Sequence, residues 1–179
     1  MGAFVPPKWR KPAPLGYGNA VDAVGTVAAP LLAGFSLASA VVVVDDATNF
    51  RWPGAAVLAL ALAAILLITA VQCAFNGRQY LWSAADVSDW WPDLVQGSRR
   101  EELLRAEQER FFHRWESWVK ATRLTYNAGI LTLLAILALV LPPLQGVGSQ
   151  ETLRWVATGI ASAACVGEAA WIAIGSRRR

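Results

Sequence analysis

The side chains that most often carry chemistry are scarce in this sequence and stand far apart. The single histidine, His113, has no second histidine and no cysteine at ligand spacing, so we expect no metal site there. Cys73 and Cys165 fall inside apolar runs, where small buried thiols are more common than disulfides or metal ligands. The sequence also lacks HExxH, GxSxG and a phosphate-cradling glycine loop. It therefore predicts neither an enzyme nor a bound cofactor.

Two adjacent acids, Asp45 and Asp46, end the apolar run 30–46, which reads PLLAGFSLASAVVVVDD. Carboxylates at the C-terminal end of a helix oppose its dipole, so this pair does not stabilise the helix. The acids continue a stripe at 4-3-4 spacing, made of Leu31, Phe35, Ala38 and Val42. If several copies surrounded an axis, this stripe would form hydrophobic constrictions below an acidic ring, which attracts cations. The alternative is that the acids only mark where the helix leaves a membrane.

Glu168 lies inside another apolar run, where an ionisable side chain is costly and is a functional candidate by default. At 1.5 Å per residue, Glu168 lies about 20 Å from Trp155, where its apolar run begins. The same arithmetic gives a similar depth for Thr69 and Thr132 of other apolar runs, and it puts Gln72 one turn further in. Two interpretations stay open. Glu168 is either a group that ties helices together by hydrogen bonding, or part of an ion site, a proton site or a contact between subunits.

The apolar residues around these positions occur in blocks. Hydrophobic residues make up 55% of the 179 residues and charged residues only 16%, which is too apolar for an ordinary soluble domain. A helix that crosses a bilayer needs roughly 20 mostly apolar residues. Four segments qualify, namely 25–44, 55–76, 124–144 and 155–175. The sequence therefore predicts an all-α integral membrane protein, with four transmembrane helices in a single membrane domain over 1–179.

Lys and Arg residues indicate how these helices are oriented, because cytoplasmic loops carry an excess of them. Fourteen of the 16 lie in the N-terminal tail 1–20, the connector 78–123 and the basic C-terminus 176–179. Only Arg51 and Arg154 lie in the two short loops. We therefore expect both termini and the connector in the cytoplasm and both short loops outside. This topology predicts a multi-pass protein of the cytoplasmic membrane.

The connector 78–123 is too long for a bare loop, so we expect it to be helical and to run without a breaker into the third membrane helix. An apolar stripe at helical spacing follows it, made of Leu103, Leu104, Phe111, Phe112, Trp115, Trp118 and Val119. Eight acids balance its eight bases, so a nucleic-acid surface is not expected. Two interpretations stay open: a helical hairpin packed beneath the membrane part, or a docking face for a soluble partner or a neighbouring subunit.

One stretch of the chain resembles, in order and spacing, the first helix and first outer loop of the Orai family. It consists of the segment PLLAGFS, then Asp46, then WPGA at 52–55. Those proteins are the pore subunits of store-operated calcium channels, and their layout of four helices with a long second connector is similar. The resemblance implies a pore of first helices at the centre of an oligomer, with Gly34 and Phe35 in its middle and Asp46 among the outer acids. Val42 stands where the family has its glutamate selectivity ring, so high calcium selectivity is not expected. Asp22 stands in the section that is basic in the family.

We therefore expect an oligomeric ion channel or pore, favouring cations and lined by the first transmembrane helix. Its stripe from Leu31 to Val42 would line the pore, and Asp45 with Asp46 would form a cation-attracting mouth. The alternative is a membrane-anchored interaction protein or effector of the toxin or defence type, switched by a soluble partner through 78–123. Both functions place the chain in a lipid bilayer, the first as a homo-oligomer, and neither involves nucleic acid.

Overall fold

A computed structural model describes residues 8–143 and 151–177, with side-chain environments up to residue 175. Its elements in chain order are α1 (Tyr17–Ala23), the π-turn η1 (Val24–Ala28), α2 (Ala29–Asp45), the 3₁₀ turn η2 (Ala47–Asn49), α3 (Pro53–Arg78), α4 (Ala84–Trp90), α5 (Arg99–Val140) and α6 (Glu151–Arg177). No strand occurs within the described residues. The predicted all-helical fold class is therefore confirmed.

Four helical segments are long and apolar enough to cross a membrane: Tyr17–Asp45, Pro53–Arg78, Arg99–Val140 and Glu151–Gly175. Each carries large apolar side chains on its outer surface, for example Phe35, Ile65 and Trp171, which are 67%, 61% and 75% exposed. Such continuous apolar surfaces are unfavourable in water. The four helices therefore fit a multi-pass membrane protein, as predicted.

Some helix boundaries differ from the sequence prediction. The first helix begins at Tyr17, within the predicted tail 1–20, and Tyr17 packs edge-on against Trp115 with ring centroids 6.1 Å apart. The third span ends as a helix at Val140, since Pro142 and Pro143 follow and proline cannot continue a helix. Residue 144, its predicted end, lies outside the described residues. Residues 1–7 of the tail and 178–179 of the basic C-terminus also lie outside the described residues. The first two residues of that predicted C-terminus, 176 and 177, belong to α6.

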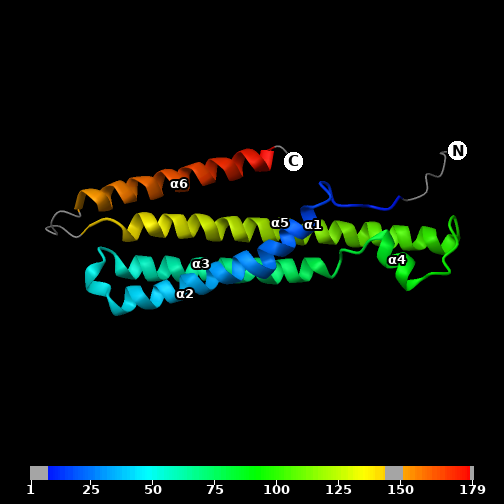
Figure 1. The fold of residues 1–179 in the computed structure, drawn as a ribbon, viewed down its shortest axis with the longest axis horizontal. Helices are drawn as coiled ribbons and strands as arrows, with labels where there is room; N and C mark the ends of the chain where they lie inside the picture. Colours follow the sequence, from blue (N-terminus) through cyan, green and yellow to red (C-terminus); the bar gives the residue numbers. More distant parts are fainter. Residues whose placement is uncertain (1–7, 144–150, 178–179) are drawn as a thin grey trace.

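The long helices pack in the order α2, α3, α5, α6, with α3 and α6 on different sides of α5 (Figure 1). The turn between α2 and α3, the end of α5 and the start of α6 lie together at what we call the loop end. Residues 8–16, α4 and the first half of α5 form the opposite, connector end. α2 and α6 are thus the outer helices of the row, and each keeps a free face.

Small residues let these helices approach one another closely. Gly129 of α5 lies against Leu67 of α3, and a Cβ at position 129 would meet Leu67 Cγ at 2.8 Å. In the same way, a Cβ at position 77 of α3 would meet the Cβ of Trp118 at 3.1 Å. Buried alanines fill most of the remaining interface between α2 and α3. Packing of small residues is the usual way in which membrane helices associate, because lipid offers no hydrophobic driving force.

The first membrane-length helix contains a π-turn, η1, one turn before Pro30. Proline lacks an N–H and its ring collides with the carbonyl four residues earlier, which disfavours a regular α-turn there. In η1 the N–H of Ala29 donates instead to the carbonyl of Val24, five residues earlier. Gly25 in this turn is buried against Ala74 of α3. The helix crosses α3 obliquely at this region (Figure 1).

Candidate functional site

The predicted stripe on α2 lies on the side of that helix away from α3. Ala29, Ala33, Ser36 and Val43 are buried and form the packed side. On the opposite side Leu31 is 58% exposed, Phe35 67% and Val42 55%, and Ala38 is exposed between them. Residues spaced at 4-3-4 share one face of a helix, and the four buried residues share the opposite face, half a turn away. The four stripe residues therefore form one continuous, uncovered apolar surface in the single chain.

Asp45 and Asp46 follow this surface at the loop end, and both are exposed. Asp45 ends α2, and the N–H of Asp46 donates to the carbonyl of Val42 at 3.0 Å, so the backbone turns away at this point. Neither carboxylate forms an ion pair or hydrogen bond with another described residue. The nearby cation Arg51 lies over the Trp52 ring, 4.7 Å from its centroid. Both carboxylates are therefore available to an ion in solution.

The polar residues of the apolar layers share a level but not a site. Leu67 lies against Gly129, and the Cys165 thiol lies 3.9 Å from the Leu131 carbonyl, so the antiparallel registers put Thr69 and Glu168 level with residues 127–128. The hydroxyl of Thr69 donates to the Ile65 carbonyl at 2.8 Å. Thr132, about one turn further along, donates to the Ala128 carbonyl at 2.8 Å. Each of these two hydroxyls thus satisfies a carbonyl of its own helix.

Glu168 lies on the side of α6 that faces α5. Ala161 is buried, Cys165 contacts the carbonyl of Leu131, and Glu168 follows at the same helical spacing and is half-buried. Thr69 and Gln72 are exposed on α3, on the other side of α5. No hydrogen bond or ion pair joins any two of Glu168, Thr69, Gln72 and Thr132 within the described part of the chain. Their predicted roles stay predictions.

Sequence reasoning missed a cavity of about 180 Å³ between α1, α3 and α5, near the connector end of the apolar layers. Its wall includes the buried thiol of Cys73 and the Trp115 ring. An ion pair between Asp22 and Arg78, with 3.2 Å between Oδ2 and the guanidinium, also lines it. Asp22 is therefore directed at α3. This pairing could not be predicted from the sequence, because the two residues are far apart in the chain and belong to different helices.

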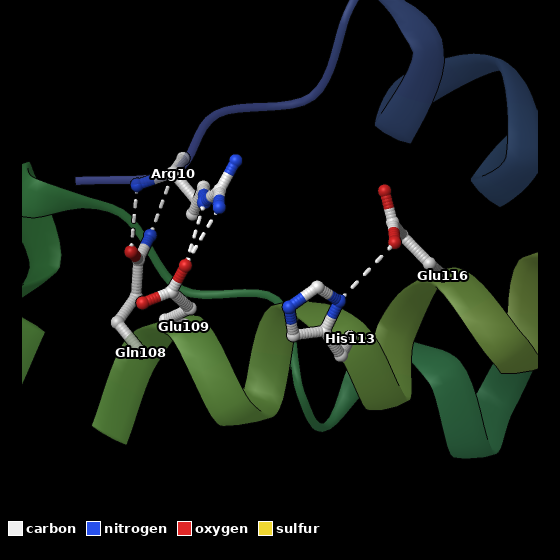
Figure 2. A network of polar contacts seen from close by, with 5 residues as sticks. All are labelled: Arg10, Gln108, Glu109, His113 and Glu116. Carbon is white, nitrogen blue, oxygen red and sulfur yellow. Dashed lines mark hydrogen bonds and ion pairs between the residues drawn. The ribbon is translucent and has the colours of Figure 1, made fainter. Parts of the chain in front are cut away.

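Sequence reasoning also missed a polar clamp between the N-terminal segment and α5 (Figure 2). The Arg10 N–H donates to Gln108 Oε1 at 2.8 Å, and Gln108 Nε2 donates to the Arg10 carbonyl at 2.7 Å. The Arg10 guanidinium also pairs with Glu109 Oε1 at 2.6 Å. Gln108 is only 2% exposed, so its amide is satisfied by backbone in a buried place. The clamp fixes residues 8–16, and through them α1, to the connector end.

The start of α5 is fixed by a second polar group, centred on Glu101. Gly97, at φ 78, adopts the left-handed conformation that glycine tolerates best, and its N–H donates to Glu101 Oε2 at 2.6 Å. Arg105 donates to the other oxygen at 2.6 Å. Hydrogen bonding by the Gly97 N–H and then by Arg105 lowers the pKa of the Glu101 carboxyl below its ordinary value. Ser98 caps the same helix by accepting from the Glu101 N–H at 3.2 Å.

The remaining candidates have plain surroundings. His113 is exposed and its Nδ1 lies 3.5 Å from a carboxylate oxygen of Glu116 (Figure 2). Cys73 and Cys165 are free thiols. Within 8–143 and 151–177, no three His, Cys, Asp or Glu side chains gather as a metal site would require. No family model, curated protein or solved structure matches this chain, so the similarity to Orai proteins stays a prediction.

Proposed function

We propose that this protein assembles into an oligomeric, cation-conducting pore lined by α2. The observation that carries the proposal is the uncovered stripe of Leu31, Phe35, Ala38 and Val42, which leads to two unpaired carboxylates. Repeated around an axis, such a stripe gives a narrow hydrophobic path, and such carboxylates give an acidic ring at its mouth. Hydrophobic constrictions and acidic rings are the two parts that gate and select in cation channels.

The order of the helices supports this assembly. α2 is an outer helix of the row α2, α3, α5, α6, so copies arranged radially would bring α2 to the axis and leave α6 at the rim. Asp22 would not obstruct the inner end of such a path, because its carboxylate pairs with Arg78 of α3. In the proposed topology the loop end faces outside, and the connector end, with most of the Lys and Arg residues, faces the cytoplasm.

The direct test is single-channel recording from the full chain in planar bilayers. We expect discrete openings, with a reversal potential in a KCl gradient that reports cation preference. Phe35→Ala should widen the hydrophobic path and raise open probability, whereas Phe75→Ala removes an equally exposed phenylalanine from α3 and should leave it unchanged. A preparation verified as oligomeric that passes no current at any voltage would overturn the pore.

The second candidate is a membrane effector that a soluble partner switches through the connector. One observation favours it: α5 is a single helix from Arg99 to Val140, so force applied to its first half reaches its apolar half directly. The Arg10 clamp would carry the same motion to α1. This function would be supported instead if the chain passed no current in bilayers and its helices changed their solvent exposure when one purified partner bound.

A further inference from the structure

The connector carries equal numbers of acids and bases, but the structure does not pair them evenly. Three of its acids pair with bases or with His113: Glu101 with Arg105, Glu109 with Arg10, and Glu116 with His113. A fourth, Asp86, is occupied in capping α4 through the backbone N–H and hydroxyl of Ser83. Glu101 and Glu109 of the first half of α5 are therefore engaged in ion pairs, whereas several arginines of the same stretch have no acidic partner among the described residues.

Those bases lie on one side of the first half of α5. Arg99, Arg100 and Arg110 are exposed and form no hydrogen bond or ion pair with another described residue. Leu103 lies among them and is 64% exposed, and Glu107 is the one acid at their centre. The buried residues of the same stretch, such as Gln108 and Phe112, point the other way. We call Arg99, Arg100, Leu103 and Arg110 the basic face.

The predicted stripe grouped Leu103 with Phe112 on one face of the helix, and the structure separates them: Leu103 is exposed and Phe112 is buried. Leu103 and Phe112 are nine residues apart, which puts them on opposite sides of one helix at 100° per residue. An exposed leucine surrounded by arginines offers a partner both apolar contact and charge. Arginine is also the base best suited to paired hydrogen bonds with carboxylates.

A lipid headgroup does not fit this face. In the proposed topology the charge-free part of α5 begins after Arg123, which at 1.5 Å per residue is about 36 Å from Arg99 and about 20 Å from Arg110. Even the shorter distance exceeds two Debye lengths of about 8 Å at physiological ionic strength. The occupant is therefore a protein surface that carries acids around an apolar group.

The same chain carries such a surface in α4 and the turn that follows. Asp89 and Asp93 are exposed and form no ion pair or hydrogen bond with another described residue. Between and beside them Trp90 is 63% exposed and Val95 is 70% exposed. We call these four residues the α4 tip. α4 lies at the connector end and projects away from the axis of α5 (Figure 1).

We propose that the α4 tip of one copy of this chain binds the basic face of α5 in a neighbouring copy. Asp89 and Asp93 would meet arginines, and Trp90 would cover Leu103. The two surfaces differ, so the contact is head-to-tail and closes into a ring when the rotation between copies allows it. The proposal rests on the assembly of copies proposed above, but it does not rest on ion conduction.

Charge reversal of the full chain in detergent tests this contact. Asp89→Arg with Asp93→Arg, or Arg99→Glu with Arg100→Glu, should each lower the association constant about tenfold, because like charges then face each other. Arg at position 89, in the last turn of α4, and Glu at the start of α5 both suit the helix dipoles, and position 93 lies beyond α4, so neither double change weakens a helix. All four substitutions in one chain should restore assembly. Lys8→Glu with Lys11→Glu, an equal change at exposed bases elsewhere, should leave it unaltered.

A crosslinking experiment tests the geometry. Two chains are made on a Cys73→Ser, Cys165→Ser background, one with Trp90→Cys and the other with Leu103→Cys, and they are oxidised together and separately. The mixture should give a disulfide-linked dimer of the two chains, and each chain alone should give none. A dimer from Trp90→Cys alone, or failure of the four-substitution chain to assemble while it remains helical, would overturn the proposal.

Conductance recorded on the same preparations separates this contact from the pore. If assembled chains crosslink as described but pass no current, the contact is supported and the pore is overturned. If chains conduct and neither charge reversal changes their assembly, the pore is supported and the contact is overturned.

Discussion

Asp45 and Asp46 are the residues through which the proposed pore would act on ions before they enter. Changing both to Asn keeps the shape of the mouth and removes its charge. We expect cation conductance at low salt to fall roughly fivefold, as the loss of about 1 kcal/mol of attraction would give. The difference should shrink in 1 M salt, because screening then acts within about 3 Å. Recording in planar bilayers measures both effects.

The matched control is Glu151→Gln, at an exposed acid that begins α6 at the loop end. It removes one carboxylate from the same end of the molecule but not from the stripe. Conductance equal to that of the wild type is expected. If Glu151→Gln lowered the current as much as the double change, the effect would belong to general surface charge and not to a mouth formed by α2.

Glu101 makes the start of α5 sensitive to acid. Its pKa is lowered by the Gly97 N–H and by Arg105, so its charged form is favoured in the folded state. A carboxyl with a lowered folded pKa contributes stability above its unfolded pKa, and this is lost as the pH falls through the folded value. Hydrogen-exchange protection at residues 97–105, measured relative to the intrinsic exchange rate at each pH, should therefore fall below about pH 4.3, the ordinary pKa of a glutamate. Glu101→Gln should show lower protection at pH 7 and little further loss of protection with acid.

At the scale of the helices, close packing of α3 on α5 depends on Gly129. A methyl group there would meet Leu67 Cγ at 2.8 Å, and Leu67 is fully buried and has no space to move into. We expect Gly129→Ala to lower the free energy of unfolding by about 1–3 kcal/mol, the usual cost of overpacking. Gly159→Ala on α6 meets no atom within 4 Å and should be neutral or slightly stabilising. Thermal unfolding in detergent, followed by circular dichroism, compares the two.

The helices themselves could be predicted from the sequence because their cause is local. Runs of about 20 apolar residues predict the long helices, and the absence of a breaker between Glu101 and Leu141 predicts that α5 is continuous. Helical spacing also predicts that the residues from Leu31 to Val42 share a face. Periodicity does not say what covers a face, however. It grouped Leu103 with Phe112 because both are apolar, although they lie on opposite sides of the helix.

What the sequence could not supply is the pairing of distant residues. Arg10 meets Gln108 and Glu109, and Asp22 meets Arg78, through the packing order of the helices. No motif predicts these contacts, since the first depends on where the segment 8–16 meets α5 and the second on how α1 and α3 are rotated about their axes. The depth of Glu168 followed from counting residues along α6. Its distance from Thr69 did not, because α5 stands between their helices.

At the scale of the whole molecule, the proposed pore mouth and the alternative of a cytoplasmic partner both depend on which end faces the cytoplasm. The connector end collects bases at one level. Arg78 is next to Gly77, which packs on Trp118, so it lies level with the α5 segment that carries Arg114, Lys120 and Arg123. A basic layer of this kind at one end of apolar helices predicts a cytoplasmic face.

Cysteine labelling in whole cells decides this orientation. On a background without Cys73 and Cys165, we expect Thr48→Cys at the loop end to react with a membrane-impermeant maleimide. Glu107→Cys at the connector end, which is equally exposed, should react only after the membrane is permeabilised. If Glu107→Cys reacted in intact cells and Thr48→Cys did not, Asp45 and Asp46 would face the cytoplasm. The basic face and the α4 tip would then lie outside the cell, where no cytoplasmic partner could reach the connector.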